Sequence, residues 1–221
     1  MNTWTLLKKD LQLDLRSLEN FLSMLFFAVT ILLLFAFALP LDDASHRLLA
    51  PGLFWVVFLL SGILNLNKLF QIEKENSCME ALLMSPISRG SIFLAKMAEN
   101  MIFVLAMQVI LIPLFSLFFY QDLLQHFFSV LGLSFLTCLG FSSLGTLLGG
   151  LTTDVRFKEI LLPILLFPLL VPLLLASVIL LKSVINGAGL GAELDWLKLL
   201  VGFDLVFALL SYLVFDYVME F

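Results

Sequence analysis

Long apolar runs with almost no charge alternate with short polar connections along the chain. A helix that spans the hydrocarbon core of a bilayer needs about 20 apolar residues, and only helices and closed barrels satisfy their backbone hydrogen bonds there. Strand-length segments of alternating hydrophobicity, which a barrel requires, are absent from the sequence. We therefore predict an all-α integral membrane protein that forms one membrane domain over residues 1–221. Its six predicted spans cover residues 21–41, 48–66, 101–119, 127–153, 160–181 and 199–219.

The sixth span is the weakest of these predictions. It contains Asp204 and Asp216, and an acidic residue at the centre of a bilayer costs about 2.5–3.5 kcal/mol on the insertion scale. Five spans followed by a re-entrant tail are therefore the alternative topology. The sequence does not settle whether Asp204 has a buried polar partner or lies near the interface.

The basic residues predict the orientation of the spans. If the spans alternate in direction, nine of the twelve Lys and Arg residues lie on one side, and only Arg47, Lys182 and Lys198 lie on the other. Basic residues gather on the cytoplasmic side of a membrane protein. Both termini and the one sizeable hydrophilic connection, residues 67–100, are therefore predicted to be cytoplasmic.

The N-terminal segment is predicted to be an amphipathic helix, over about residues 1–20, that lies in the cytoplasmic interface. Its apolar residues form one stripe at helical spacing: Trp4, Leu7, Leu11, Leu15, Leu18 and Leu22. Three basic residues in this segment are balanced by Asp10, Asp14 and Glu19. Since its formal charge is zero, we expect the stripe, rather than attraction to anionic lipid, to anchor the helix.

The connection 67–100 is predicted to contain a short exposed helix that couples the membrane domain to a partner. Ser77 and Glu80 have the spacing of a capping box, and Pro86 ends the helix because the residue before proline avoids the helical region. A second helix starts at Ser88 or Ser91 and continues into the third span. The alternative is a solvated loop without a partner. The residues assigned to coupling are Ser77, Met79, Glu80, Leu82, Leu83 and Pro86.

The fourth and fifth spans have unusual compositions. Gly145 and Gly149 form a GxxxG pair on a face of small residues, which lets helices approach closely in lipid. Packing within the subunit is the default interpretation, and a subunit interface is the alternative. The fifth span contains three prolines, each of which removes a backbone donor and favours a kink or break. These are Pro163, Pro168 and Pro172.

Composition and charge exclude several classes of protein. The chain is 62% hydrophobic and 13% charged, with a mean hydropathy of +1.10, whereas an ordinary soluble domain is about 25% charged. This composition excludes soluble enzymes and disordered proteins. A disulfide scaffold is also excluded, because Cys78 and Cys138 are the only cysteines. A net charge of −5 argues against nucleic-acid binding. The sequence contains no HExxH, GxSxG, CxxC or phosphate-loop motif, so we expect neither an enzyme nor ATP binding by that loop.

Several stretches of the sequence resemble one known family. They are Ala50-Pro51-Gly52-Leu53-Phe54-Trp55-Val56, then Glu73, Glu80-Ala81-Leu82-Leu83, Ser85-Pro86 and Ala95-Lys96, and the proline-rich fifth span from Glu159 to Pro172. Together they resemble the haem exporter protein B family, the permease subunit of the cytochrome c maturation ABC transporter. The loop pattern is shared with other type-2 ABC permeases, whereas the Ala-Pro-Gly stretch and the three prolines point to the narrower family.

The resemblance implies a type-2 ABC exporter fold, located in a bacterial inner membrane. It also implies a separate ATPase subunit that supplies all ATP chemistry, two copies of the permease, a haem-handling membrane protein and a small single-span protein. Haem is then a transported or handled ligand rather than a cofactor of this chain. The resemblance does not say whether His46 or His126, the only histidines, contact haem.

Two other functions stay open at the level of sequence. The chain could be a membrane assembly or remodelling subunit that transports nothing, or an ABC permease for another apolar substrate. The spans contain few polar side chains, chiefly Gln108 and Asp204, which argues against a hydrophilic substrate.

Overall fold

The computed structural model describes residues 3–39, 43–69, 88–119, 122–152 and 157–218, and this part of the chain consists of helices joined by short turns, without strands. Six helices are long and apolar enough to cross a membrane, which confirms the predicted six-span, all-α fold. They are α2 (Glu19–Ala38), α3 (Asp43–Lys68), α6 (Arg89–Phe119), α7 (Phe127–Thr152), α8 (Lys158–Ile185) and α9 (Leu194–Val218). A shorter helix, α1 (Thr3–Ser17), precedes them. Two short 3-10 helices, η1 (Asp122–Leu124) and η2 (Leu190–Glu193), precede α7 and α9.

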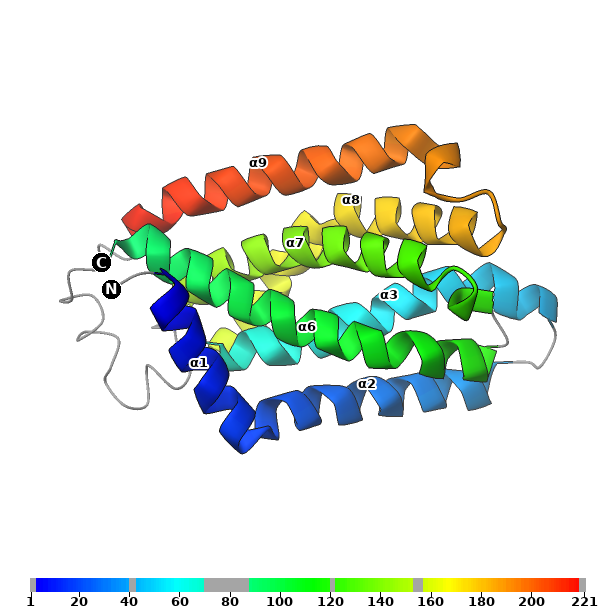
Figure 1. Ribbon diagram of the computed structural model, residues 1–221, viewed down its shortest axis with the longest axis horizontal. Helices are drawn as coiled ribbons and strands as arrows, with labels where there is room; N and C mark the ends of the chain where they lie inside the picture. Colours follow the sequence, from blue (N-terminus) through cyan, green and yellow to red (C-terminus); the bar gives the residue numbers. More distant parts are fainter. Residues whose placement is uncertain (1–2, 40–42, 70–87, 120–121, 153–156, 219–221) are drawn as a thin grey trace.

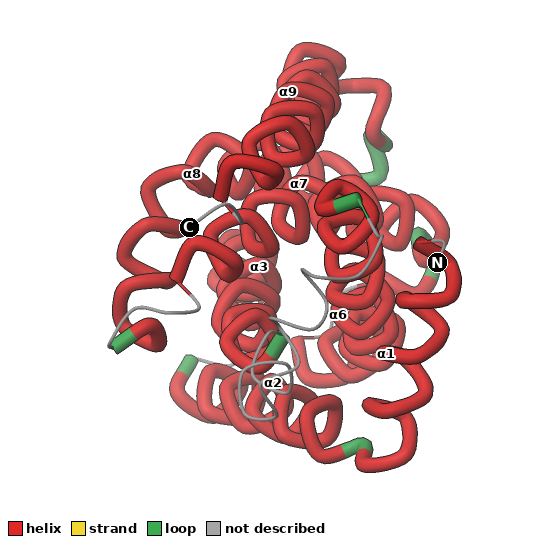
Figure 2. Tube along the Cα trace, turned by 90° about the vertical axis from the view of Figure 1, so that its left-hand side faces the viewer, coloured by secondary structure: helices red, strands yellow, loops and turns green. Residues whose placement is uncertain are grey.

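The spans form an antiparallel bundle with α7 at its centre. α7 contacts α3, α6, α8 and α9, whereas α2 packs on α3 and α6 at the opposite edge from α9 (Figures 1 and 2). α1 lies across one end of the bundle, against the start of α6 (Figure 1). We call this the α1 end. The 3-10 helices lie at the other end.

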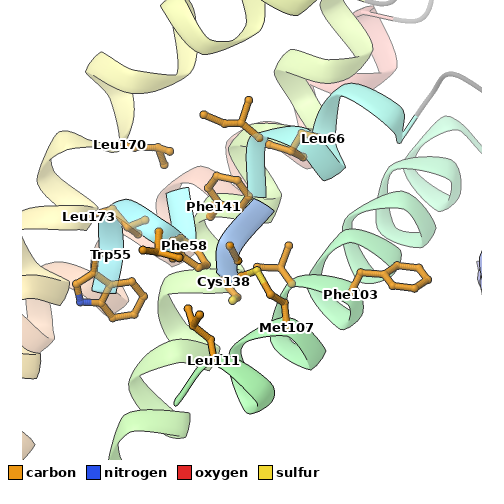
Figure 3. Close-up of a cluster of buried hydrophobic side chains, with 14 of the residues drawn as sticks. Trp55, Phe58, Leu66, Phe103, Met107, Leu111, Cys138, Phe141, Leu170 and Leu173 are labelled. Carbon is orange, nitrogen blue, oxygen red and sulfur yellow. The ribbon is translucent and has the colours of Figure 1, made fainter. Parts of the chain in front are cut away.

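An aromatic cluster fills the middle of the bundle. Trp55 on α3 is buried and makes edge-to-face contacts with Phe54 and Phe58, whose ring centroids lie 5.2 and 5.3 Å away. Phe58 in turn packs on Phe141 of α7, with a centroid distance of 5.1 Å. Figure 3 shows Trp55, Phe58 and Phe141 gathered with Cys138 between α3, α6, α7 and α8. The Ala50–Val56 stretch of the sequence therefore includes core-packing residues.

The N-terminal amphipathic segment is divided into two helices. α1 ends at Ser17 and α2 begins at Glu19, so the predicted helix over residues 1–20 is interrupted. Leu18 between them has φ 51° and ψ 0°, a left-handed conformation that is unfavourable for any residue with a Cβ. Its N–H donates to the carbonyl of Asp14, and its own carbonyl accepts from the N–H of Leu22, both at 2.8 Å. The chain therefore changes direction at one residue.

The third and fifth spans are longer than predicted. α6 starts directly after Ser88, whose hydroxyl accepts a 3.3 Å hydrogen bond from the N–H of Ser91, as a helix-capping serine does. The second start predicted in segment 67–100 is therefore present, and residues 89–100 continue the third span. α8 runs without interruption through Pro163, Pro168 and Pro172, so the prolines do not break it.

Candidate functional site

A group of buried polar residues lies at the α1 end, where α3 and α6 approach segment 70–87. α3 ends at Lys68 and α6 begins at Arg89, so these two helices carry the two ends of that segment. We call residues 61–68 of α3 the α3 stalk and residues 89–100 of α6 the α6 stalk. The stalks are the covalent connections between segment 70–87 and the bundle.

A chain of side-chain hydrogen bonds joins both stalks to α7. Asn65 of the α3 stalk donates from Nδ2 to Oδ1 of Asn100, at 2.7 Å. Asn100 of the α6 stalk donates from its own Nδ2 to Oγ of Ser142 on α7, at 2.8 Å. All three residues are buried. A polar group shut away from water needs such partners, so these bonds favour one relative position of the three helices.

A buried ion cluster adjoins the amide chain and joins the α6 stalk to α1. The Lys96 Nζ lies 3.0 Å from a carboxylate oxygen of Glu99, one turn along the same helix, and 3.2 Å from a carboxylate oxygen of Asp10 on α1. The side chains of Lys96, Glu99 and Asp10 are each at most 6% exposed. Taking charges out of water is costly unless they are paired, and Lys96 is the cation that both buried carboxylates share.

The inward face of α1 differs from the one that the apolar stripe suggested. Leu6, Leu7, Asp10 and Asp14 are buried against the bundle, whereas Leu15 of the stripe is exposed. Two acidic residues of this segment, Asp10 and Asp14, therefore face the protein. Most of the leucine stripe is free to face lipid, as an interfacial helix requires.

Gly145 lies in the same seam as the amide chain. A Cβ at Gly145 would overlap the side chain of Leu66, the residue next to Asn65 on the α3 stalk. Ser142 and Gly145 are three residues apart on α7, so the polar bond and the close helix approach share one face. Gly149 is also buried, one turn further along. The contact of Gly145 is thus made within this chain.

The structure describes only some of the remaining candidate residues. Asp204 is buried in α9, where it occupies the space beside Gly140 of α7, and neither of its carboxylate oxygens has a hydrogen-bond partner in the described part of the chain. The backbone carbonyl of His126 accepts from the N–H of Val130 at the start of α7, and the side chain of His46 lies outside the described residues. The six coupling candidates also lie outside them: Ser77, Met79, Glu80, Leu82, Leu83 and Pro86.

Comparison with known proteins identifies the family. A family model described as CcmB protein matches residues 1–220, which is nearly the whole chain. The chain belongs to the CcmB protein family. It is 30% identical over 203 residues to the heme exporter protein B of Pseudomonas aeruginosa, covering 90% of this chain and 89% of that protein. It is 27% identical over 189 residues to the protein of the same name from Haemophilus influenzae, covering 84% and 81%. The family resemblance seen in the sequence is thereby confirmed.

Inspection of the sequence did not find the polar network of this CcmB family member. Asn65, Asn100 and Glu99 stand next to apolar runs and were indistinguishable from ordinary boundary residues. One usable signal was present, because Leu6, Leu7, Asp10 and Asp14 follow helical spacing and therefore share one face of α1. Their partners on α6 are more than 80 residues away, and only the fold brings them together.

Proposed function

We propose that this chain is the membrane permease subunit of an ABC transporter that serves haem export or haem delivery in cytochrome c maturation. The observation that carries the proposal is the match of the CcmB family model to residues 1–220, and relatives named heme exporter protein B support it. The six spans fit a permease. Haem is the substrate or handled ligand, and ATP is hydrolysed by a separate subunit.

The proposed assembly contains two permease copies and two ATPase subunits in a bacterial inner membrane, with both termini of the permease in the cytoplasm. A haem-handling membrane protein and a small single-span protein complete it. The ATPase docks on residues 77–84, where Met79, Leu82 and Leu83 would otherwise form an exposed apolar patch, a feature that usually marks an interaction site. Glu80 acts as a capping residue or pairs with a basic residue of the ATPase.

The geometry of the stalks supports this coupling. Both ends of segment 70–87 lead directly into α3 and α6, so a force applied there reaches two spans at once. The hydrogen bonds from Asn65 to Asn100 and from Asn100 to Ser142 then hold both stalks to α7. A partner that binds segment 70–87 can therefore act on the centre of the bundle.

Co-purification of the ATPase tests the docking assignment. Leu83→Asp places a charge in the apolar patch and should abolish co-purification and lower the level of mature c-type cytochromes, while the amount of permease in the membrane stays unchanged. Ser88→Asp is the matched control, because it adds the same charge at the exposed start of α6 and aspartate caps a helix as well as serine does. If Leu83→Asp retains the ATPase and normal cytochrome levels, the docking assignment is wrong and α1 becomes the next candidate.

A further inference from the structure

α1 is joined by the chain to α2 but packs on a different helix. Its main contacts are with α6, and it touches α2 only slightly. The backbone turns at Leu18 in a left-handed conformation, so α2 does not continue the direction of α1. The position of α1 is therefore set by what holds it to the α6 stalk.

Lys96 is the cation that α1 and the α6 stalk share. Glu99, on its own helix, already pairs with it at 3.0 Å, so the α6 stalk has a complete ion pair without α1. Within the described residues, the carboxylate of Asp10 has one other basic partner, Lys9 at 2.9 Å, but Lys9 belongs to α1 and is 43% exposed. Of these two bases, Lys96 is the one that links α1 to another helix.

The buried acids of α1 make this link specific. Asp10 and Asp14 both face inward, beside Leu6 and Leu7. The two leucines alone would allow α1 to slide or roll on an apolar surface, since hydrophobic contact is not directional. The contact between the Asp10 carboxylate and the Lys96 Nζ, at 3.2 Å, is directional, and a roll or slide of α1 would break it.

We propose that Lys96 is a positioning residue of this permease, which holds α1 on the α6 stalk through Asp10 and makes α1 follow any movement of that stalk. The inference rests on the proposed function only for the source of the movement. The attachment itself is a property of this chain and can be measured without a partner.

Distances between spin labels test the attachment in the full-length chain, reconstituted in lipid nanodiscs with Cys78 and Cys138 replaced. Labels at Gln12 on α1 and Leu117 on α6, both exposed, report on the α1–α6 contact. Labels at Phe26 on α2 and Leu117 form the reference pair, which reports on the bundle itself.

Asp10→Ala removes the link but leaves the pair between Lys96 and Glu99 intact, so the bundle should fold. We expect the Gln12–Leu117 distance distribution to become at least twofold wider, with no change in the reference pair. Lys9→Ala is the matched control, because it removes the other base near Asp10, and should leave both distributions narrow. The exchange Asp10→Lys with Lys96→Asp should restore a narrow Gln12–Leu117 distribution.

A Gln12–Leu117 distribution that stays narrow in Asp10→Ala overturns the proposal, since the leucines would then suffice. So does equal widening of the reference pair, because Lys96 and Asp10 would then hold the whole bundle. In cells, Asp10→Ala should lower mature c-type cytochromes severalfold at an unchanged permease level, and the exchange variant should recover them. If α1 is detached in Asp10→Ala and cytochrome levels stay normal, the coupling role of Lys96 is refuted. The proposed function is tested separately: it fails if the unaltered permease does not co-purify with an ATPase.

Discussion

Two buried amides on α6 allow a direct test of the polar network. Asn100 and Gln108 lie about two turns apart on one helix, and both are completely buried. Asn100 uses its carbonyl and its amino group in hydrogen bonds to Asn65 and Ser142, whereas neither amide atom of Gln108 has a partner among the described residues. Replacing each amide by an apolar side chain of similar size, Asn100→Leu and Gln108→Met, should therefore have opposite consequences.

The expected magnitude for Asn100→Leu follows from the bonds it removes. Two side-chain hydrogen bonds between membrane helices contribute about 0.6 kcal/mol each on average. The amino group of Asn65 is then left buried without an acceptor, which costs about 1–3 kcal/mol more. The burial of the Ser142 hydroxyl costs less, because this hydroxyl can still donate a hydrogen bond to the carbonyl one turn back in α7. The sum is a loss of about 2–4 kcal/mol in the free energy of unfolding.

Gln108→Met should leave stability unchanged or raise it. The amide of Gln108 is buried without partners, and replacing such a group by an apolar one removes an unfavourable burial of about 1–3 kcal/mol. The two variants thus differ in sign although both remove a buried amide from the same helix.

Thermal denaturation of the purified permease in detergent, followed by size-exclusion chromatography after heating, measures the difference. For a chain of this size 1 kcal/mol corresponds to about 2–4 °C in Tm, so we expect Asn100→Leu to melt about 10 °C below the wild type. Gln108→Met should melt at or above the wild-type temperature. Equal losses in both variants would refute the reasoning, because burial of an amide rather than its hydrogen bonds would then determine stability.

Three further predictions concern packing, the α1–α2 junction and orientation. Gly145→Leu should lower the free energy of unfolding by about 1–3 kcal/mol through overlap with Leu66 of α3. Gly132→Leu, at an open position on the same helix, should not lower it. Equal yield and Tm in both variants would show that α3 and α7 are not closely packed at Gly145. Leu18→Gly should fold normally because glycine accepts positive φ. Leu18→Pro should lower the free energy of unfolding by about 3 kcal/mol or more, because the hydrogen bond from the N–H of Leu18 is lost. A normal Tm for the proline variant would contradict this. A cysteine at Ser88 should react with impermeant reagent from the cytoplasmic side and one at Gly191 from the outer side; the reverse pattern would invert the topology.

The sequence predicted the fold well because the dominant physical constraint is simple. A span must be a helix of about 20 apolar residues, so its existence can be recognised without any knowledge of its neighbours. Boundaries were harder to predict. The apolar run of the third span was bounded at residue 101, whereas the helix that was predicted to start at Ser88 or Ser91 and to lead into it is continuous from Arg89 and includes Lys96 and Glu99, which pair with each other. Their opposite charges at i, i+3 spacing suit a continuous helix.

The polar network was not predictable for a different reason. In a soluble protein the polar face of an amphipathic helix faces water, but an interfacial helix has both lipid and protein as neighbours. Leucines can then face lipid while acids face the bundle, as Leu15 and Asp10 do. A single sequence gives the faces of α1 correctly, yet it does not say which face meets the protein. The partner of Asp10 on that face, Lys96, lies 86 residues further along the chain and is brought to α1 only by folding.

α7 is where the separate contacts of this permease converge. Ser142 accepts the hydrogen bond from the α6 stalk, Gly145 receives Leu66 of the α3 stalk, and Gly140 receives Asp204 of α9. Small side chains at these positions let the neighbouring helices come close, and a closely packed interior has little free volume in which a displacement could be absorbed. A movement of either stalk must therefore move α7 or break the contact. The face of small residues on α7 is consequently the route by which a force on segment 70–87 would reach α9, the span most exposed to its surroundings among the six.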